Sequence, residues 1–285
     1  MANSTRVEPV VVTPPSSAPL PILFDSPHSG FELPEDFGHS APMEALLSSR
    51  DAFVDELWSG VVQRGAVLIA ATFPRCYIDP NRAETDIDQD LLAEPWPGEL
   101  RPEKYSRAGM GLIRRLALPG VPMYQRKLSV AEVQHRIDAY YRPYRAALKA
   151  QADAACRRFG AVWHVDCHSM KSRGNEMNTD SGQARPDVVV SDRLGSSADP
   201  AFTRWVSEEL RRLGLSVQVN HPYQGGDLLN AISAPAQRRH SIQIELNRAL
   251  YMDERTISRS PGFAALKSKL DAFADGLADY VRGQL

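Results

Sequence analysis

The sequence predicts an α/β fold with three layers, in which a mixed and mostly parallel sheet carries helices on both faces. Short apolar runs of strand length alternate along the chain with longer segments of helical periodicity. The chain has 285 residues, 43% of them hydrophobic, which is enough to bury one large core. We therefore expect a lead over residues 1–19 and a single domain over residues 20–285.

The expected strands are short apolar runs bounded by turn-forming residues. They lie at residues 22–24, 66–71, 161–165, 188–190, 217–219 and 242–246. Residues 1–19 precede them and are rich in Pro, Ser and Val. We interpret this lead as either a flexible segment or an edge segment of the sheet.

The expected helices have apolar residues spaced three and four positions apart. They cover residues 51–64, 128–159, 201–213 and 261–285. The first of them ends at Gly65, a typical helix stop. The second opens with Ser129 and Glu132 at the spacing of a capping box. Pro143 lies inside it and is expected to kink or split the helix.

Charge and hydropathy restrict the class of partner. The 33 basic and 35 acidic residues give a net charge of −2, without a long run of one sign, so neither a nucleic acid nor a membrane surface is expected as a partner. No apolar run is long enough to span a bilayer, and no apolar signal core follows Arg6. We expect a cytoplasmic protein that binds a small molecule, with its oligomeric state left open.

Two histidines follow expected strands. In sheets of this kind, ligands bind at the carboxyl ends of the strands. His28 follows the strand at 22–24 and His168 follows the strand at 161–165. Either histidine alone would pass for a core or loop residue, but the pair at two strand ends indicates a metal site, because imidazole is a common zinc ligand.

A catalytic zinc usually takes three protein ligands and one water molecule, so a third ligand is needed. Asp51 is the best candidate, because it begins the helix expected at 51–64, directly after the loop that holds His28. Asp55 and Glu56 are the rivals, one turn further along.

Residues 74–82 follow the second expected strand and contain Arg75, Asn81 and Arg82. Guanidinium groups bind carboxylates with two parallel hydrogen bonds, so this segment could hold an acidic substrate. The alternative is a loop that is tied together by Arg–Asp pairs.

Glu245 lies inside the apolar run at 242–246. Burial of a carboxylate is unfavourable and raises its pKa toward the working range of a general base. The alternative is a structural salt bridge to Arg248 or to another arginine.

The segment 220–226 follows the strand expected at 217–219, and its glycines indicate a tight turn or a close backbone approach. His221, Tyr223 and Gly225 are its candidate substrate contacts, and an ordinary loop residue is the alternative for His221.

Taken in order, these segments resemble the N-formylglutamate amidohydrolase family. The matching stretches are SPHSG at 26–30, RDAFVDELW at 50–58, PRCYIDPNR at 74–82, VDCHSM at 165–170, PDVVVSDRLG at 186–195, NHPYQGG at 220–226 and IQIELNR at 242–248. The family is similar to zinc carboxypeptidases and aspartoacylases. The resemblance therefore implies a zinc carboxypeptidase-like (phosphorylase/hydrolase-like) fold with one Zn²⁺ per chain, or another divalent metal, held by two histidines and an acid.

The resemblance also implies roles. His28 and His168 would be ligands, and Asp51 fills the place of the acidic ligand with a different spacing and residue type. Arg82, beside Asn81, would hold a substrate carboxylate, and Arg75 would polarise the scissile carbonyl. In the late strand, Glu-Leu at 245–246 matches the general-base position.

The implied reaction is hydrolysis of N-formyl-L-glutamate, or of another short N-acyl acidic amino acid, to the free acid and the amino acid. Three alternatives remain. The same metal chemistry could act on another N-acyl amino acid or a small peptide. A serine hydrolase could use Ser29 or Ser169, although neither lies in a Gly-x-Ser-x-Gly elbow. A non-catalytic relative could bind the ligand without turnover.

Overall fold

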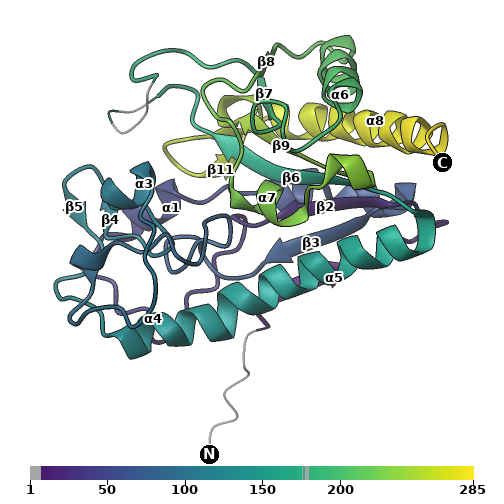
Figure 1. Cartoon of the computed structure of the whole chain (residues 1–285). Helices are drawn as coiled ribbons and strands as arrows, with labels where there is room; N and C mark the ends of the chain where they lie inside the picture. Colours follow the sequence, from purple (N-terminus) through teal and green to yellow (C-terminus); the bar gives the residue numbers. More distant parts are fainter. Residues whose placement is uncertain (1–7, 175, 177–179) are drawn as a thin grey trace, which may run out of the picture.

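The computed structural model describes residues 8–174, 176 and 180–285. Within this part of the chain, the main element is a seven-stranded sheet with the order β1-β3-β2-β6-β9-β7-β8 (Figure 1). Its strands are β1 (Val10–Thr13), β2 (Ile22–Ser26), β3 (Val67–Ala71), β6 (Val162–Met170), β7 (Val188–Ser191), β8 (Val217–Val219) and β9 (Arg239–Asn247). The central strands β3, β2, β6 and β9 are parallel, whereas β1 runs antiparallel to β3 and β7 antiparallel to β9. The predicted mixed and mostly parallel sheet is confirmed.

All six predicted strands are present in the main sheet, and the structure adds β1 to that sheet. β1 pairs with β3 from Val10 opposite Ala71 to Thr13 opposite Leu68. For residues 10–13, the prediction of a flexible lead is therefore wrong, and the alternative of an edge segment of the sheet is correct. Residues 1–7 of that lead lie outside the described residues.

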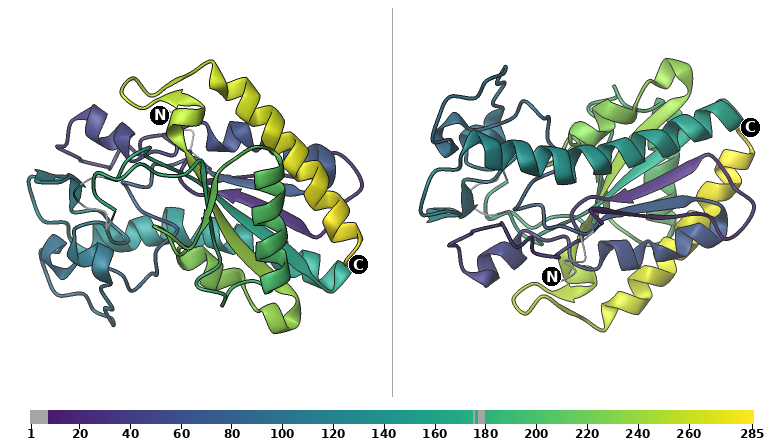
Figure 2. Two further views of the ribbon diagram at one scale, coloured as in Figure 1. Left: turned by 90° about the horizontal axis from the view of Figure 1, so that it is seen from above. Right: turned by 90° about the horizontal axis from the view of Figure 1, so that it is seen from below.

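Helices cover both faces of the sheet, as predicted. In Figure 2, α8 and α6 lie over one face and α5 lies across the other. One layer contains α2 (Val54–Leu57), α6 (Pro200–Arg212) and α8 (Gly262–Arg282), and the other contains α1 (Met43–Ser48), α4 (Val130–Arg136), α5 (Arg142–Phe159) and α7 (Asp227–Ile232).

Smaller elements lie in the connections. They are helix α3 (Lys104–Arg107), the hairpins β4–β5 (Leu116–Leu118 and Val121–Pro122) and β10–β11 (Met252–Asp253 and Ser258–Arg259), and the 3₁₀ turns Ser59–Arg64, Gln89–Leu91, Pro235–Gln237 and Arg248–Leu250. In the described part of the chain, no helix has both the length and the apolar character needed to cross a bilayer.

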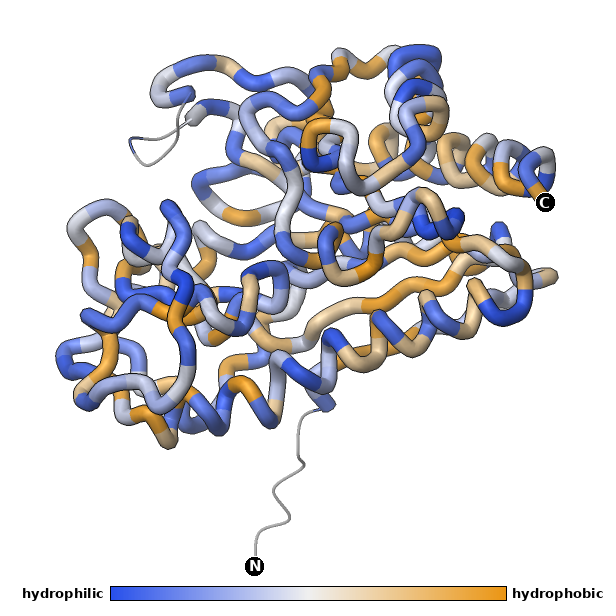
Figure 3. Tube along the Cα trace, in the orientation of Figure 1, coloured by the Kyte–Doolittle hydropathy of each residue, from blue (hydrophilic) through white to orange (hydrophobic). Residues whose placement is uncertain are grey.

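The two central strands β6 and β9 have one apolar face and one polar face. On the side of α2, α6 and α8, their apolar side chains join one hydrophobic core. Figure 3 shows further long apolar stretches in the strands of the sheet that lie just above α5. Because side chains alternate along a strand, every second residue points the other way. These buried polar residues are His164, Asp166 and His168 on β6 and Ser241, Gln243 and Glu245 on β9. The candidate site lies at one end of this polar row.

The helical segment predicted at 128–159 forms a continuous rod with a wider turn inside it. The capping box is confirmed, because the Ser129 hydroxyl accepts from the backbone of Glu132 and the Glu132 carboxylate accepts from the backbone of Ser129. A π-helical turn at Ile137–Tyr141 separates α4 from α5, and Pro143 lies in the first turn of α5. Proline lacks an N–H and its ring clashes with the carbonyl four residues earlier, and the wider π turn accommodates both effects.

The single helix predicted at 51–64 is wrong. Helix α2 begins only after Phe53, whose φ of 65° is left-handed, and it is followed by a 3₁₀ turn at Ser59–Arg64. The reason is tertiary, because the backbone N–H of Asp51 donates to His28 and its carboxylate is bound inside the protein. Asp51 therefore precedes the helix instead of beginning it.

The strand-end argument for residues 220–226 is also wrong in its geometry. β7 runs antiparallel to β9, and β8 is parallel to β7, so β8 points away from the edge at which β2, β3, β6 and β9 end. The loop after β8 returns across the polar face, where the backbone N–H of Gly226 donates to the Gln243 side chain at 2.9 Å.

Candidate functional site

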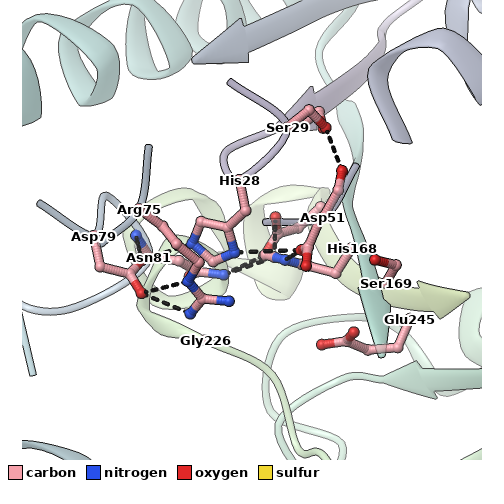
Figure 4. A network of polar contacts seen from close by, with 12 residues as sticks. His28, Ser29, Asp51, Arg75, Asp79, Asn81, His168, Ser169, Gly226 and Glu245 are labelled. Carbon is pink, nitrogen blue, oxygen red and sulfur yellow. Dashed lines mark hydrogen bonds and ion pairs between the residues drawn. The ribbon is translucent and has the colours of Figure 1, made fainter. Parts of the chain in front are cut away.

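The structure brings His28, Asp51 and His168 together from three distant parts of the chain (Figure 4). His28 lies in the turn after β2, Asp51 before α2, and His168 within β6. The Asp51 Oδ2 atom is 3.0 Å from His168 Nδ1 and 3.4 Å from His28 Nδ1. All three side chains are buried, and one candidate ligand atom from each lies within 4.8 Å of the others.

The outer nitrogen of each histidine faces a carboxylate. His28 Nε2 is 2.7 Å from Asp79 Oδ1, and His168 Nε2 is 2.8 Å from Asp166 Oδ1. Such pairs are typical of metal-binding histidines, because they fix the ring and leave the other nitrogen to the metal. The inward Nδ1 of His28 is buried and has no hydrogen-bond partner among the described residues. Two imidazoles and a carboxylate with this orientation fit a divalent metal.

Asp51 is ionised in this setting. Burial opposes its ionisation, but the hydrogen bond with His168 and the proximity of His28 and Arg248 outweigh burial and hold the pKa of Asp51 well below its usual range. Arg248 also donates to its Oδ1 atom at 2.9 Å, which leaves Oδ2 facing the histidines. For His168, burial lowers the pKa, but the nearby Asp166 and Asp51 outweigh it and raise the pKa well above the usual value. Cation binding would release this proton, because a ligand imidazole is neutral.

The structure distinguishes Asp51 from its rivals. Asp55 and Glu56 line a separate cavity with Arg50 and Ser59, and Glu56 pairs with Arg259 near the surface. Among the described residues, Asp51 is the acid that joins both histidines in a potential metal-binding group.

Arg75 and Asn81 are already engaged within the protein. The Arg75 guanidinium donates twice to Asp79 Oδ2, at 3.1 and 2.6 Å. The Asn81 side chain donates to Asp166 at 2.8 Å and accepts from the backbone N–H of Leu228 at the start of α7. The alternative of a loop that is tied together by Arg–Asp pairs therefore holds for Arg75. Arg75 and Asn81 also line the cavity beside the two histidines.

Arg82 differs from Arg75. Its guanidinium stacks on the Tyr105 ring at 4.3 Å, and it forms no ion pair with any residue in the described ranges. It also lines the cavity beside the two histidines. Its charge is thus available to an anionic ligand.

Glu245 lies directly opposite His168 in the β6–β9 ladder. Its Oε1 atom accepts a hydrogen bond from Gln243 at 2.9 Å. Burial raises the pKa of Glu245 to about 7, even though the nearby His168 lowers it. The alternative of a salt bridge to Arg248 is wrong, because Arg248 binds Asp51 instead. Glu245 is therefore a buried carboxyl group that titrates in the range useful for proton transfer.

These side chains line a cavity of about 190 Å³. Most of the predicted substrate contacts are present in its wall, namely Arg75, Asn81, Arg82, Tyr223 and Gly225. His221 is not, because it lines an adjoining cavity of about 490 Å³. The wall also contains residues that the sequence did not single out, which are Tyr105, Met110, Arg114 and Gln243. Arg114 has no strand-end position and no motif, so no sequence signal marked it.

In the part of the chain described, neither candidate serine nucleophile forms a hydrogen bond with a histidine through its hydroxyl. The Ser29 hydroxyl bonds to Ser26 and to the backbone oxygen of Asp51, and the Ser169 hydroxyl accepts from Arg248. A Ser–His–Asp arrangement does occur deeper in the polar row. Its members are Ser241, His164 and Asp25, which are linked at 2.7 and 2.8 Å and are fully buried, so no substrate reaches them.

Comparisons with known proteins identify the family of this chain. A model of the N-formylglutamate amidohydrolase family matches residues 20–252. The N-formylglutamate deformylase of Pseudomonas putida is 27% identical over 239 residues, which cover 82% of this chain and 83% of that protein. The crystal structure of N-formylglutamate amidohydrolase from Ralstonia eutropha JMP134 is similar with a TM-score of 0.94 and 45% identity, and covers 98% of this chain and 100% of that chain. A protein of Agrobacterium tumefaciens shares the fold at 18% identity, with a TM-score of 0.67 over 96% of this chain and 95% of that chain. The chain belongs to the N-formylglutamate amidohydrolase family.

Proposed function

We propose that this protein hydrolyses the amide bond of N-formyl-L-glutamate to formate and L-glutamate, with one zinc ion held by His28, Asp51 and His168. The observation that carries the proposal is the convergence of these three ligand atoms directly beside Glu245. The names of the Pseudomonas putida and Ralstonia eutropha relatives support the substrate. Two histidines and a carboxylate are a common ligand set of catalytic zinc.

A bound zinc ion polarises the amide carbonyl and lowers the pKa of water. Glu245 removes a proton from the attacking water as the new carbon–oxygen bond forms. It then transfers this proton to the amide nitrogen as the carbon–nitrogen bond breaks, so formate and the free amine leave. A carboxyl group whose pKa lies near 7 can both accept and release a proton under these conditions.

The arginines have different roles in this mechanism. Arg75 is held by Asp79 and stabilises the negative charge that develops on the carbonyl oxygen. Arg82 has no carboxylate partner among the described residues and binds a carboxylate of the substrate with two parallel hydrogen bonds. Tyr223 and Gly225 line the same cavity and shape it around the substrate.

The test is formate release from N-formyl-L-glutamate by the purified, zinc-loaded protein, with and without a chelator. Zinc-dependent turnover is the expected result. Turnover that persists after the metal is removed would exclude the metal mechanism. Turnover confined to other N-acyl amino acids or peptides would exclude the substrate, and metal-loaded protein without turnover on any of them would indicate a ligand-binding relative.

A further inference from the structure

A second cavity adjoins the candidate active site and is rich in positive charge. It has a volume of about 140 Å³. The two cavities share part of their walls, namely Arg75, Met110, Arg114, Ser169 and Tyr223. We call the second one the cationic cavity, because its lining includes Arg75, Arg114, Lys171, Arg185 and Arg248. Among its lining residues, the one acidic side chain is Asp51.

Three of these five cations already hold a carboxylate. The pairs are Arg75–Asp79 at 2.6 Å, Arg185–Asp180 at 2.7 Å and Arg248–Asp51 at 2.9 Å. Their charges are largely compensated within the protein, so they add little net attraction for a further anion.

Arg114 and Lys171 are different. Neither forms an ion pair within residues 8–174, 176 and 180–285, and the buried Nε atom of Arg114 has no hydrogen-bond partner there. Burial and the neighbouring Arg75 lower the pKa of Arg114 to about 10. Burial and Arg248 likewise lower the pKa of Lys171. Asp79 and Glu254 offset this only in part, so two desolvated cations remain without a direct ion-pair partner in the described ranges, and a bound anion would reduce that penalty.

We propose that the cationic cavity binds the second carboxylate of a dicarboxylic substrate through Arg114 and Lys171. The inference rests on the proposed function, in which the substrate is an N-formyl acidic amino acid and Arg82 binds its other carboxylate. The cavity is small and shares five wall residues with the candidate active site, so its position suits one arm of a bound substrate. The clamp of Arg82 at one carboxylate and Arg114 with Lys171 at the other makes the site selective for diacids over their mono-amides.

The experiment compares N-formyl-L-glutamate, which has two carboxylates, with two mono-amides that each lack one of them: N-formyl-L-glutamine, which lacks the γ-carboxylate, and the α-amide of N-formyl-L-glutamate, which lacks the α-carboxylate. If Arg114 and Lys171 bind the same carboxylate, the amide that lacks this carboxylate should become as good a substrate as the diacid. Arg114→Met and Lys171→Met should therefore each lose the preference for the diacid over this one amide. The expected change in kcat/KM ratio is about 10- to 100-fold, as for a lost hydrogen bond to a charged group. Arg82→Met should lose the preference over the other amide.

Matched controls are Arg107→Met and Lys127→Met, which remove exposed cations that line neither cavity. Both should keep the parent ratios. Arg114→Lys is a milder variant that keeps the charge and loses the two-pronged geometry, and it should lose part of the preference. Parent ratios for both amides in Arg114→Met and Lys171→Met would overturn the proposal. So would an equal loss on all three substrates, because that pattern indicates a general effect on the reaction.

Calorimetric binding of L-glutamate, L-glutamine and L-isoglutamine to the metal-loaded protein separates this inference from the proposed function. If glutamate binding depends on Arg114 and Lys171 while N-formylglutamate is not hydrolysed, the proposed function fails and the cavity assignment stands. If N-formylglutamate is hydrolysed while Arg114→Met and Lys171→Met bind and turn over like the parent, the cavity assignment alone fails.

Discussion

His168 on β6 lies directly opposite Glu245 on β9 in the parallel ladder of the sheet. One ladder position therefore sets both a candidate metal ligand and the candidate base. Because both strands are central and buried, the backbone of the sheet, and not a loop, fixes the separation of His168 and Glu245. Pre-organised groups on rigid elements are what proton transfer at a fixed distance requires.

The metal site is tested by removing its ligands. His28→Ala and His168→Ala proteins should lose nearly all bound divalent metal after loading and desalting, and Asp51→Ala should lose most of it. Elemental analysis by mass spectrometry measures the occupancy. Asp55→Ala is the matched control and should keep the parent occupancy, because Asp55 lines a different cavity. Full occupancy in both histidine variants would exclude the site, and metal loss in Asp55→Ala but not in Asp51→Ala would show that the third ligand is Asp55.

The base is tested by Glu245→Gln, which keeps the size of the side chain. The variant should fold and bind metal like the parent, and should lose about 10²- to 10⁴-fold in kcat. Steady-state kinetics and metal analysis on the same preparation measure both. Glu209→Gln on α6 is a control far from the site, where the carboxylate pairs with Arg212. Near-parent turnover in folded, metal-loaded Glu245→Gln would rule out the role of base.

The pH profile gives an independent test of the same residue. Glu245 acts as a base only when ionised, and its pKa is raised to about 7 by burial. We therefore expect kcat/KM to fall by about tenfold per pH unit as the pH drops below the pKa of this carboxyl group. A bound divalent cation shifts this acidic limb to lower pH. The limb should disappear from the residual activity of Glu245→Gln, and an unchanged limb in that variant would assign the titration to another group.

Arg75 and Arg82 should affect different kinetic constants. Arg82→Ala should raise KM by about 10- to 100-fold, because its proposed contact with the substrate carboxylate is made before and during the reaction. Arg75→Ala should instead lower kcat by about 10²- to 10³-fold, because its proposed partner is charge that develops in the transition state. Arg82→Lys should recover only part of the loss. The same pattern in both alanine variants would contradict the division of roles.

Asp79 tests the support behind the metal ligands. Its carboxylate contacts His28 Nε2 at 2.7 Å and accepts hydrogen bonds from Nε and Nη2 of Arg75. Asp79→Asn should weaken metal binding by about 10- to 100-fold, as measured by competition with a chromogenic chelator. Asp55→Asn removes a half-buried carboxylate that lines a different cavity and should leave the metal affinity unchanged. An unaltered affinity in Asp79→Asn would show that this carboxylate only serves Arg75.

Local patterns in the sequence are sufficient for most of the architecture. The apolar positions in the runs at 22–24, 161–165 and 242–246 predict strands, because each run is short, rich in β-branched and aromatic residues and bounded by turn-forming residues. Ser129 and Glu132 mark the start of α4, since a capping box depends on only four neighbouring residues. Strand-end positions predict His28 and His168, and the family resemblance adds the roles.

Tertiary contacts decided the rest. Asp51 joins the histidines because the chain turns left-handed at Phe53, and that turn is fixed by bonds from Asp51 to parts of the chain far away in sequence. β7 runs antiparallel to β9, which no local pattern encodes, so the strand-end position expected for residues 220–226 was wrong. Arg114 reaches the site from a connection without regular periodicity. Short-range spacing fixes which residues form a strand or a cap, whereas strand direction and the convergence of loops depend on the packing of distant segments, and only the folded chain brings those together.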